Sequence, residues 1–225
     1  GKRMLYKSEL MMLEMLANTN WERPIYMAIT VGQENHLNLG DNFMQEGLAY
    51  RITPFNTTKL NARIDSEKMY DNLMHKFKFG GIDKDDIYLD ETILRMAQTH
   101  RRMFVQVASQ LIKEGKNEKA LKALDYCQQV IPSKNVAHDY VMSSSKEMAD
   151  AYIALGEYAK AEAILDELGN KAVEYITWYM SLDDERLALS YDNCIRNFYI
   201  LDEINKSLER ITSLKTGQPE GEMTV

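Results

Sequence analysis

Two segments of the chain repeat each other at a constant offset of 41 residues, and this repeat constrains the fold more than any other feature. When Gly115 is aligned with Gly156, the flanking apolar and small residues also match. The matched pairs are Leu111 and Tyr152, Ile112 and Ile153, Ala120 and Ala161, Leu124 and Leu165, and Asp125 and Asp166. Such a period, with a glycine inside each unit, is typical of stacked helix pairs that bury their apolar faces against one another.

The spacing within each unit resembles a tetratricopeptide repeat, which places large, small and turn residues at fixed intervals over about 34 residues. The first unit has a permitted residue at each place: Phe104, Val107, Ala108, Leu111, Gly115, Ala120, Leu124, Cys127 and Pro132. The second has Met148, Ala149, Tyr152, Gly156, Ala161, Leu165 and Leu168. It departs from the pattern at Ser145, where a large aromatic residue is usual, and it lacks the closing proline. Seven residues beyond the usual period predict a longer loop near residues 133–140.

Two further helices are predicted after the repeats. One follows Gly169 and runs through Tyr175, Trp178 and Tyr179, and a break at residues 181–184 separates it from a long final helix. The final helix has an apolar stripe of Leu187, Tyr191, Cys194, Phe198, Leu201, Ile204, Leu208 and Ile211. Because two repeats are fewer than a stable stack usually needs, we expect this helix to close the stack.

Composition agrees with a helical globular fold. Four prolines and eleven glycines in 225 residues favour long helices, and 45% hydrophobic residues suffice for a buried core. A net charge of −7 argues against nucleic acid as a partner, because a phosphate backbone is bound by cationic surfaces. The longest uncharged apolar stretch, Ile25–Val31, is far shorter than the roughly 20 residues that span a bilayer. Since the chain begins with Gly1, we interpret it as an excised piece of a longer protein.

The N-terminal region has a different periodicity. A helix is predicted over Leu5–Leu16, and strands over Ile25–Val31 and Leu48–Thr53, with a helical turn near Asp41–Glu46 between them. Two strands are marginal alone, so we expect this sheet to lie on the first helix. A further helix should begin at Ser66 as its cap and end at Gly80–Gly81.

These patterns predict a mainly α fold, a tetratricopeptide-like helical repeat array preceded by a small α/β cap with a two-stranded sheet. The predicted boundaries are residues 1–89 for the cap, 90–216 for the repeats with the closing helix, and 217–225 for a disordered tail.

Two short boxes in the cap region add a family resemblance. The run NWERPIY covers Asn20–Tyr26, and the run GLAYRITP covers Gly47–Pro54. Both resemble boxes of a family of multi-pass membrane proteins related to protein O-mannosyltransferases, which are glycosyltransferase type C-like, in the soluble C-terminal part that precedes tetratricopeptide-like helices. The box residues of interest are Trp21, Arg23, Pro24, Tyr26, Tyr50 and Arg51.

The resemblance implies an extramembrane domain on the periplasmic or exoplasmic face, in a protein whose catalytic and lipid-linked sugar sites belong to membrane segments absent from this chain. The box residues themselves allow two interpretations. Aromatic and arginine side chains can line a binding face, or they can anchor the strands, with Trp21 packed and the arginines paired to local acids such as Glu22. We favour anchoring.

No motif for catalysis or cofactor binding is found. The histidines His36, His75, His100 and His138 lack the spacing of a zinc site. The acidic run beginning at Asp83 differs from a calcium loop at its sixth and twelfth positions, Tyr88 and Leu94. Cys127 and Cys194 lie 67 residues apart among apolar residues, so we expect buried thiols, while a disulfide between them stays open. We therefore expect no catalytic residue, metal or cofactor in this chain.

Partner binding is the favoured function class. Repeat arrays bind peptides or partner helices on the concave face, which the first helix of each pair lines. By helix register this face should carry Arg102, Ser109, Lys113, Lys146 and Asp150. The partner would be a protein or peptide, such as an acceptor protein or the protein's own membrane domain. The alternatives are a free-standing tetratricopeptide adaptor and, less favoured, an enzyme built around the small sheet.

Overall fold

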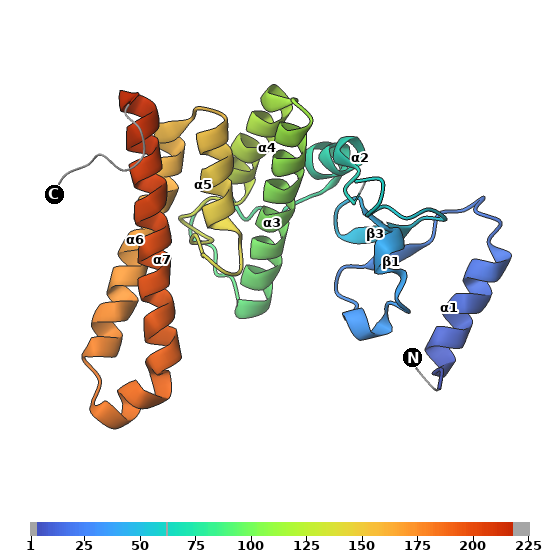
Figure 1. The fold of residues 1–225 in the computed structure, drawn as a ribbon, viewed down its shortest axis with the longest axis horizontal. Helices are drawn as coiled ribbons and strands as arrows, with labels where there is room; N and C mark the ends of the chain where they lie inside the picture. The colour runs from blue at the N-terminus through green and yellow to red at the C-terminus, as the bar shows by residue number, and fades with distance from the viewer. Residues whose placement is uncertain (1–3, 62, 218–225) are drawn as a thin grey trace. The chain divides into compact units, whose positions relative to one another are not determined.

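The computed structural model of the chain describes residues 4–61 and 63–217, which fall into two compact units, Gly1–Phe77 and Lys78–Val225 (Figure 1). The fold is mainly helical, with a small antiparallel sheet in the first unit, which confirms the predicted fold class. The predicted tail lies outside the described residues except for Gly217, which ends the last helix with a φ of 70°.

The first unit contains short elements joined by turns. They are α1 (Lys7–Asn18), β1 (Tyr26–Ala28), the 3-10 turns η1 (Gln33–Asn35) and η2 (Leu39–Asn42), β2 (Phe43–Gln45), β3 (Ala49–Ile52), α2 (Ser66–Asp71) and the π-helical turn η3 (Asn72–Lys76). The first predicted strand, residues 25–31, is longer than β1, because residues 29 and 30 form a turn, although half-buried and exposed residues alternate over the whole segment. The second predicted strand is β3.

The sheet has three strands among the described residues, in the antiparallel order β1–β3–β2, so the predicted count of two was wrong. The missed strand is β2, which follows η2 where a helical turn was expected. Its backbone is held by distant partners: the Gln45 N–H donates to the Arg63 carbonyl at 2.8 Å, and the Thr57 hydroxyl donates to the Phe43 carbonyl at 2.7 Å. A strand of three residues is too short to show a period in sequence.

The apolar interior of the first unit involves α2 and η3, not α1, which corrects a second expectation. Phe43 and Ile52 from the sheet and Met69 and Leu73 from α2 and η3 are buried. Within α1, Glu9 is buried, Met12 and Leu16 are half-buried, and four apolar side chains are exposed: Leu10, Met11, Leu13 and Met15.

The ends of the second helical segment also differ from the prediction. Asp65, not Ser66, is its cap, because the Asp65 carboxylate accepts a hydrogen bond of 3.0 Å from the Lys68 N–H. The segment ends at Phe77 after the π turn, before Gly80 and Gly81. Gly47 turns the chain between β2 and β3 with a φ of 133°, and a Cβ there would lie 3.1 Å from the Phe77 ring. The glycine of the second box is thus required by the backbone.

The second unit is a stack of helices: α3 (Glu91–Lys113), α4 (Asn117–Val130), α5 (Ser145–Ala154), α6 (Tyr158–Met180) and α7 (Asp184–Thr216). α3 packs against α4 and α5, α5 against α6 and α7, and α6 against α7. The apolar repeat positions from Phe104 to Cys127 and from Met148 to Leu168 are at most 3% exposed. Gly115 and Gly156 make the two intra-repeat turns with φ of 74° and 79°. The helix packing therefore agrees with a helical repeat array.

The predicted inter-repeat loop is present, since α4 ends at Val130 and α5 begins at Ser145. Residues 78–89, which the sequence placed with the cap, contact the helical unit instead. The Phe79 ring lies 5.8 Å from that of Phe104, and the Asn135 amide donates to the Ile82 and Lys84 carbonyls at 2.7 Å. These contacts explain why the two compact units divide after Phe77.

The last two helices correct two further expectations. α6 continues through Gly169 without a break, and a Cβ at Gly169 would meet Ile204 of α7 at 3.9 Å. The apolar stripe of α7 is buried at Cys194, Ile204 and Ile211, but Tyr191 and Phe198 are exposed. Only the C-terminal half of α7 therefore closes the stack. The other half pairs with α6 in a hairpin that extends past α5 (Figure 1).

Candidate functional site

The two boxes meet around a buried carboxylate that the sequence did not single out. Tyr26 and Arg51 are cross-strand partners in β1 and β3. The Tyr26 hydroxyl donates to Glu46 Oε2 at 2.8 Å, Lys68 Nζ lies 2.6 Å from the same oxygen, and Arg51 Nε lies 2.7 Å from Oε1. The Glu46 side chain is 4% exposed, so these contacts replace water around the charge.

The charged contacts of this cluster hold Glu46, Lys68 and Arg51 together and so link three elements of the first unit. The hydrogen bond from Lys68 to Glu46 is the main cause that raises the pKa of Lys68 above its usual value. The Arg51 Nε–H is not aligned with the Glu46 oxygen, so their contact is an ion pair rather than a hydrogen bond. Arg51 Nη2 also lies 4.0 Å from Asp65. One carboxylate thus joins β1, β3 and α2, and it has no free face for chemistry.

The other box residues divide into packed and exposed side chains. Tyr50 stacks on Phe43 with ring centroids 5.4 Å apart. Trp21 is 44% exposed in a turn where its φ is 60°, and Arg23 and Pro24 are exposed. The anchoring interpretation therefore describes Tyr26, Tyr50 and Arg51, and not Trp21.

Sequence reasoning missed both Glu46 and Lys68. Arg51 pairs with Glu46 and not with Glu22, the acid named from sequence. Glu46 directly precedes the second box, which is a usable signal, but nothing near Lys68 in the sequence indicates its role. A lysine 22 residues from its partner becomes adjacent only through the fold.

The predicted concave-face residues lie on neighbouring helices. Arg102 and Ser109 on α3 are half-buried, and Lys113 near the end of α3 is exposed. On α5, Lys146 Nζ and Asp150 Oδ2 form an ion pair of 2.8 Å with each other. Because α3 packs on α5, the five residues belong to adjacent elements, and their role in binding stays a prediction.

A buried serine–histidine pair also lies near the inter-repeat loop. Ser145 Oγ lies 2.8 Å from His138 Nδ1 and 2.7 Å from Ser143 Oγ. The backbone N–H of His138 donates to the Glu167 carboxylate at 2.8 Å. Ser145 is 0% and His138 2% exposed, and burial lowers the pKa of His138 to about 4. Ser145, which would be the nucleophile of such a pair, has no exposed surface from which to reach a substrate, so the pair is structural.

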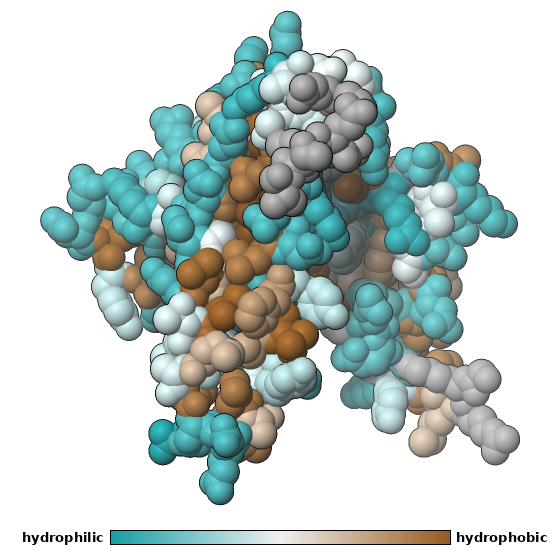
Figure 2. Space-filling view, turned by 60° about the vertical axis from the view of Figure 1, so that its left-hand side comes forward, coloured by the Kyte–Doolittle hydropathy of each residue, from teal (hydrophilic) through white to brown (hydrophobic). Residues whose placement is uncertain are grey.

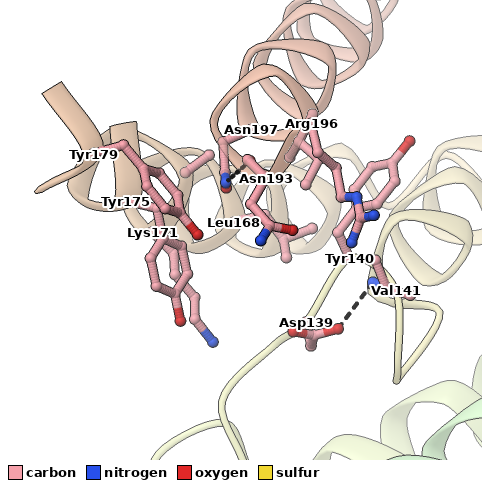
Figure 3. Close-up of a pocket in the computed structure, with 12 residues that line it drawn as sticks. Asp139, Tyr140, Val141, Leu168, Lys171, Tyr175, Tyr179, Asn193, Arg196 and Asn197 are labelled. Atoms are coloured by element: carbon pink, nitrogen blue, oxygen red, sulfur yellow. Dashed lines mark hydrogen bonds between the residues drawn. The ribbon is translucent and has the colours of Figure 1, made fainter. Parts of the chain in front are cut away.

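A cavity of about 190 Å³ lies where the inter-repeat loop meets α6 and α7 (Figure 3). α5 has 10 residues whereas α6 has 23 and α7 has 33, so the hairpin extends past α5 and the loop takes its place. The lining residues with polar groups include Tyr140 from the loop, Lys171, Tyr175 and Tyr179 from α6, and Asn193 and Arg196 from α7.

A second hollow, of about 500 Å³, is bordered by α4 and α6. The loop residues Ser133 and His138 and Tyr152 of α5 also line it. Three of its polar groups are bound to one another, because the Tyr152 hydroxyl donates to Asp125 at 3.0 Å and Lys160 Nζ donates to the same carboxylate at 2.8 Å. Burial is the main cause that raises the pKa of Tyr152, and the Asp125 carboxylate adds to it. This hollow is therefore a weaker candidate for ligand binding.

Both cysteines are buried thiols, and the described part of the chain holds no cluster of metal ligands. Cys127 and Cys194 are both free and buried, as predicted for buried thiols, and burial raises the pKa of the Cys127 thiol to about 12. Among residues 4–61 and 63–217, no three or more His, Cys, Asp or Glu side chains are placed to hold a metal ion. No helix in the described part of the chain is long and apolar enough to cross a membrane.

The fold and these sites define a helical-repeat domain joined to a small sheet-bearing unit. Within it, residues 1–69 match the family model of TMEM260-associated domain 2. The match ends at Met69, inside α2, and includes both boxes. Comparisons with curated proteins and with solved structures gave no match.

Proposed function

We propose that the chain is a non-catalytic extramembrane domain of an O-mannosyltransferase-like membrane protein, in which it holds a protein or peptide partner. The match of residues 1–69 to TMEM260-associated domain 2 carries this proposal. Two box residues within the match, Tyr26 and Arg51, contact the buried Glu46 in a structural link, which fits an accessory unit better than a catalytic one.

The repeat array supplies the partner-binding part of the proposal. α3 and α5 present Arg102, Ser109, Lys113, Lys146 and Asp150, and such arrays bind peptides or helices on this face. The partner would be the acceptor protein or the membrane domain of the same protein. The domain would lie on the periplasmic or exoplasmic face, where the lipid-linked sugar donor of such enzymes is used.

A free-standing tetratricopeptide adaptor is the second candidate, and one observation favours it: the family match ends at residue 69, before the repeats begin. The gene upstream of residue 2 separates the two, because a dozen hydrophobic spans there would support the membrane-protein role and exclude the adaptor.

The decisive experiment removes residues 90–216 from the full-length protein and measures glycan transfer and capture of the acceptor. We expect one or both to fall. If both stay unchanged, the proposed function is wrong. A finer variant, R102A/K146A, should weaken partner capture while R210A, an exposed cation on α7, should not. Circular dichroism of each variant checks that the helices are intact.

A further inference from the structure

The cavity between the inter-repeat loop, α6 and α7 is lined by two cations, Lys171 and Arg196, and by one carboxylate, Asp139 (Figure 3). Within residues 4–61 and 63–217, neither Lys171 nor Arg196 forms an ion pair. The chain as a whole carries a net charge of −7, so two unpaired cations lining one cavity are a local exception. Such a site attracts an anionic group.

The one carboxylate that lines the cavity keeps its charge but is held by the backbone, so the lining carries two cations to one anion. Asp139 Oδ1 accepts hydrogen bonds from the Val141 N–H at 2.9 Å and the Met142 N–H at 2.6 Å. Asn197 is committed as well, because its amide donates to the Asn193 carbonyl at 2.8 Å. The remaining polar groups are the two cations, the Asn193 amide and tyrosine hydroxyls, so the cavity is rich in donors.

The size of the cavity limits what can enter it. A cavity of about 150 Å³ holds a benzene ring, so about 190 Å³ accepts one ring-sized group and is too small for a drug-sized molecule. Three tyrosines and the aliphatic residues Leu168 and Ile200 give it a partly apolar wall.

The surroundings of the cavity suit a longer ligand. Figure 2 shows hydrophobic side chains gathered along the α6–α7 hairpin, where Trp178, Tyr191 and Phe198 are about half exposed. Trp178 packs edge-on against Tyr179 of the cavity wall, with centroids 4.8 Å apart. A chain whose one side chain fills the cavity would therefore have apolar surface beside it for its flanking residues.

We propose that this cavity binds an acidic peptide segment, with one aromatic or aliphatic side chain inside it and a carboxylate on each side of that residue, one paired with Lys171 and the other with Arg196. This inference rests on the proposed partner-binding role and names the chemistry of the partner. The cavity is separate from the predicted face on α3 and α5, since none of those five residues lines it.

The test uses the 225-residue chain with the substitution Trp21→Phe, which leaves Trp178 as the only tryptophan. Trp178 emission is titrated with a nine-residue peptide in which glutamates flank a central phenylalanine, and with matched peptides containing glutamine or lysine in place of glutamate. We expect saturable binding of the acidic peptide, weakening with added salt, and at least about tenfold weaker binding of the other two.

Charge-reversed variants locate the site. Arg196→Glu and Lys171→Glu should each weaken the acidic peptide about tenfold, while Arg196→Lys retains most of the affinity. Arg210→Glu, an equal charge change at an exposed position of the same helix, should have no effect. Equal binding of all three peptides, or unchanged binding by both reversed variants, overturns the proposal.

Two further measurements test whether something other than a peptide binds in the cavity. If glutarate or glucuronate alone binds as tightly as the peptide, the ligand is a small acid and the proposal is wrong. If sedimentation shows a dimer of the free chain that R196E dissociates, a second copy occupies the cavity and the proposal is equally wrong. If the peptide does not bind but the 90–216 deletion still reduces acceptor capture, only the cavity assignment is wrong. If the deletion leaves both glycan transfer and acceptor capture unchanged, the proposed function is wrong.

Discussion

Arg101 and Val136 are 35 residues apart in the chain, and Arg101 Nη2 donates a hydrogen bond of 2.6 Å to the Val136 carbonyl. The same guanidinium donates to the Ile131 and Ala137 carbonyls at 3.0 and 3.1 Å. Arg101 is 0% exposed, and burial lowers its pKa. One arginine of α3 therefore satisfies three carbonyls of the inter-repeat loop, which also forms part of the cavity wall through residues 139–141.

Replacing Arg101 with methionine should cost about 3 kcal/mol or more in the free energy of unfolding, because three buried carbonyls lose their donors. Urea denaturation measures the change. Arg95→Met on the same helix removes only an exposed ion pair with Glu91 and should stay within about 0.5 kcal/mol. Similar losses in the two variants would contradict the role assigned to Arg101.

Stability should fall as the pH is lowered from 7 to 5, in part because His138 is buried and neutral. Its folded pKa of about 4 lies below the unfolded value of about 6.5, so the unfolded chain binds the proton first. The folded state therefore loses about 2 kcal/mol over this interval, with the loss beginning near pH 6.5. The measurement is the free energy of unfolding against pH for the wild type and His138→Gln. A parallel dependence in both proteins would show that other groups cause it.

Replacing Glu46 with glutamine should destabilise the first unit by about 2 kcal/mol, because Arg51 and Lys68 lose the charge that pairs them. The loss is less than for a fully buried pair, since both cations are about one third or more exposed and can recover water. Thermal unfolding of the intact chain is the measurement. Asp71→Asn, which removes an exposed pairing with Lys76, should leave the transition unchanged.

The helical part was predictable because its signals are periodic and local. The turn glycines Gly115 and Gly156 and the buried alanines Ala120 and Ala161 lie at regular intervals, and each residue needs only its own helix and the next one to be interpreted. The inter-repeat loop was predictable from its length alone.

The contacts that build the sites were not predictable, since each joins residues far apart in the chain. β2 depends on backbone hydrogen bonds to Arg63, and Arg101 serves carbonyls more than 29 residues away. The cavity arises because α5 is much shorter than α6. This difference in length was not predicted, because the sequence was expected to end a helix at Gly169, in the middle of α6. Glycine costs only about 1 kcal/mol inside a helix, so packing against Ile204 outweighs its tendency to end one.

Ser145 is a departure from the repeat pattern that the structure explains, and restoring an aromatic residue there should be harmful. Its hydroxyl bonds to His138 and Ser143 in a site with no exposed surface. Ser145→Phe should therefore cost about 2 to 3 kcal/mol through overpacking. Ser145→Ala should cost about 1 kcal/mol through the lost hydrogen bonds. Urea denaturation compares them, and stabilisation by phenylalanine would show that the standard repeat geometry holds after all.

Two glycines of the second unit should respond in opposite directions to alanine. Gly156 has a φ of 79° with no atom within 4 Å of an added Cβ, so Gly156→Ala suffers backbone strain alone and should lose about 1 kcal/mol. Gly169 lies inside α6, where an added Cβ would make an ordinary contact of 3.9 Å with Ile204. Gly169→Ala should therefore gain about 0.5 to 1 kcal/mol by restricting the unfolded chain. Chemical denaturation of both variants is the measurement. A loss at Gly169 would mean that α6 and α7 approach too closely there for a methyl group.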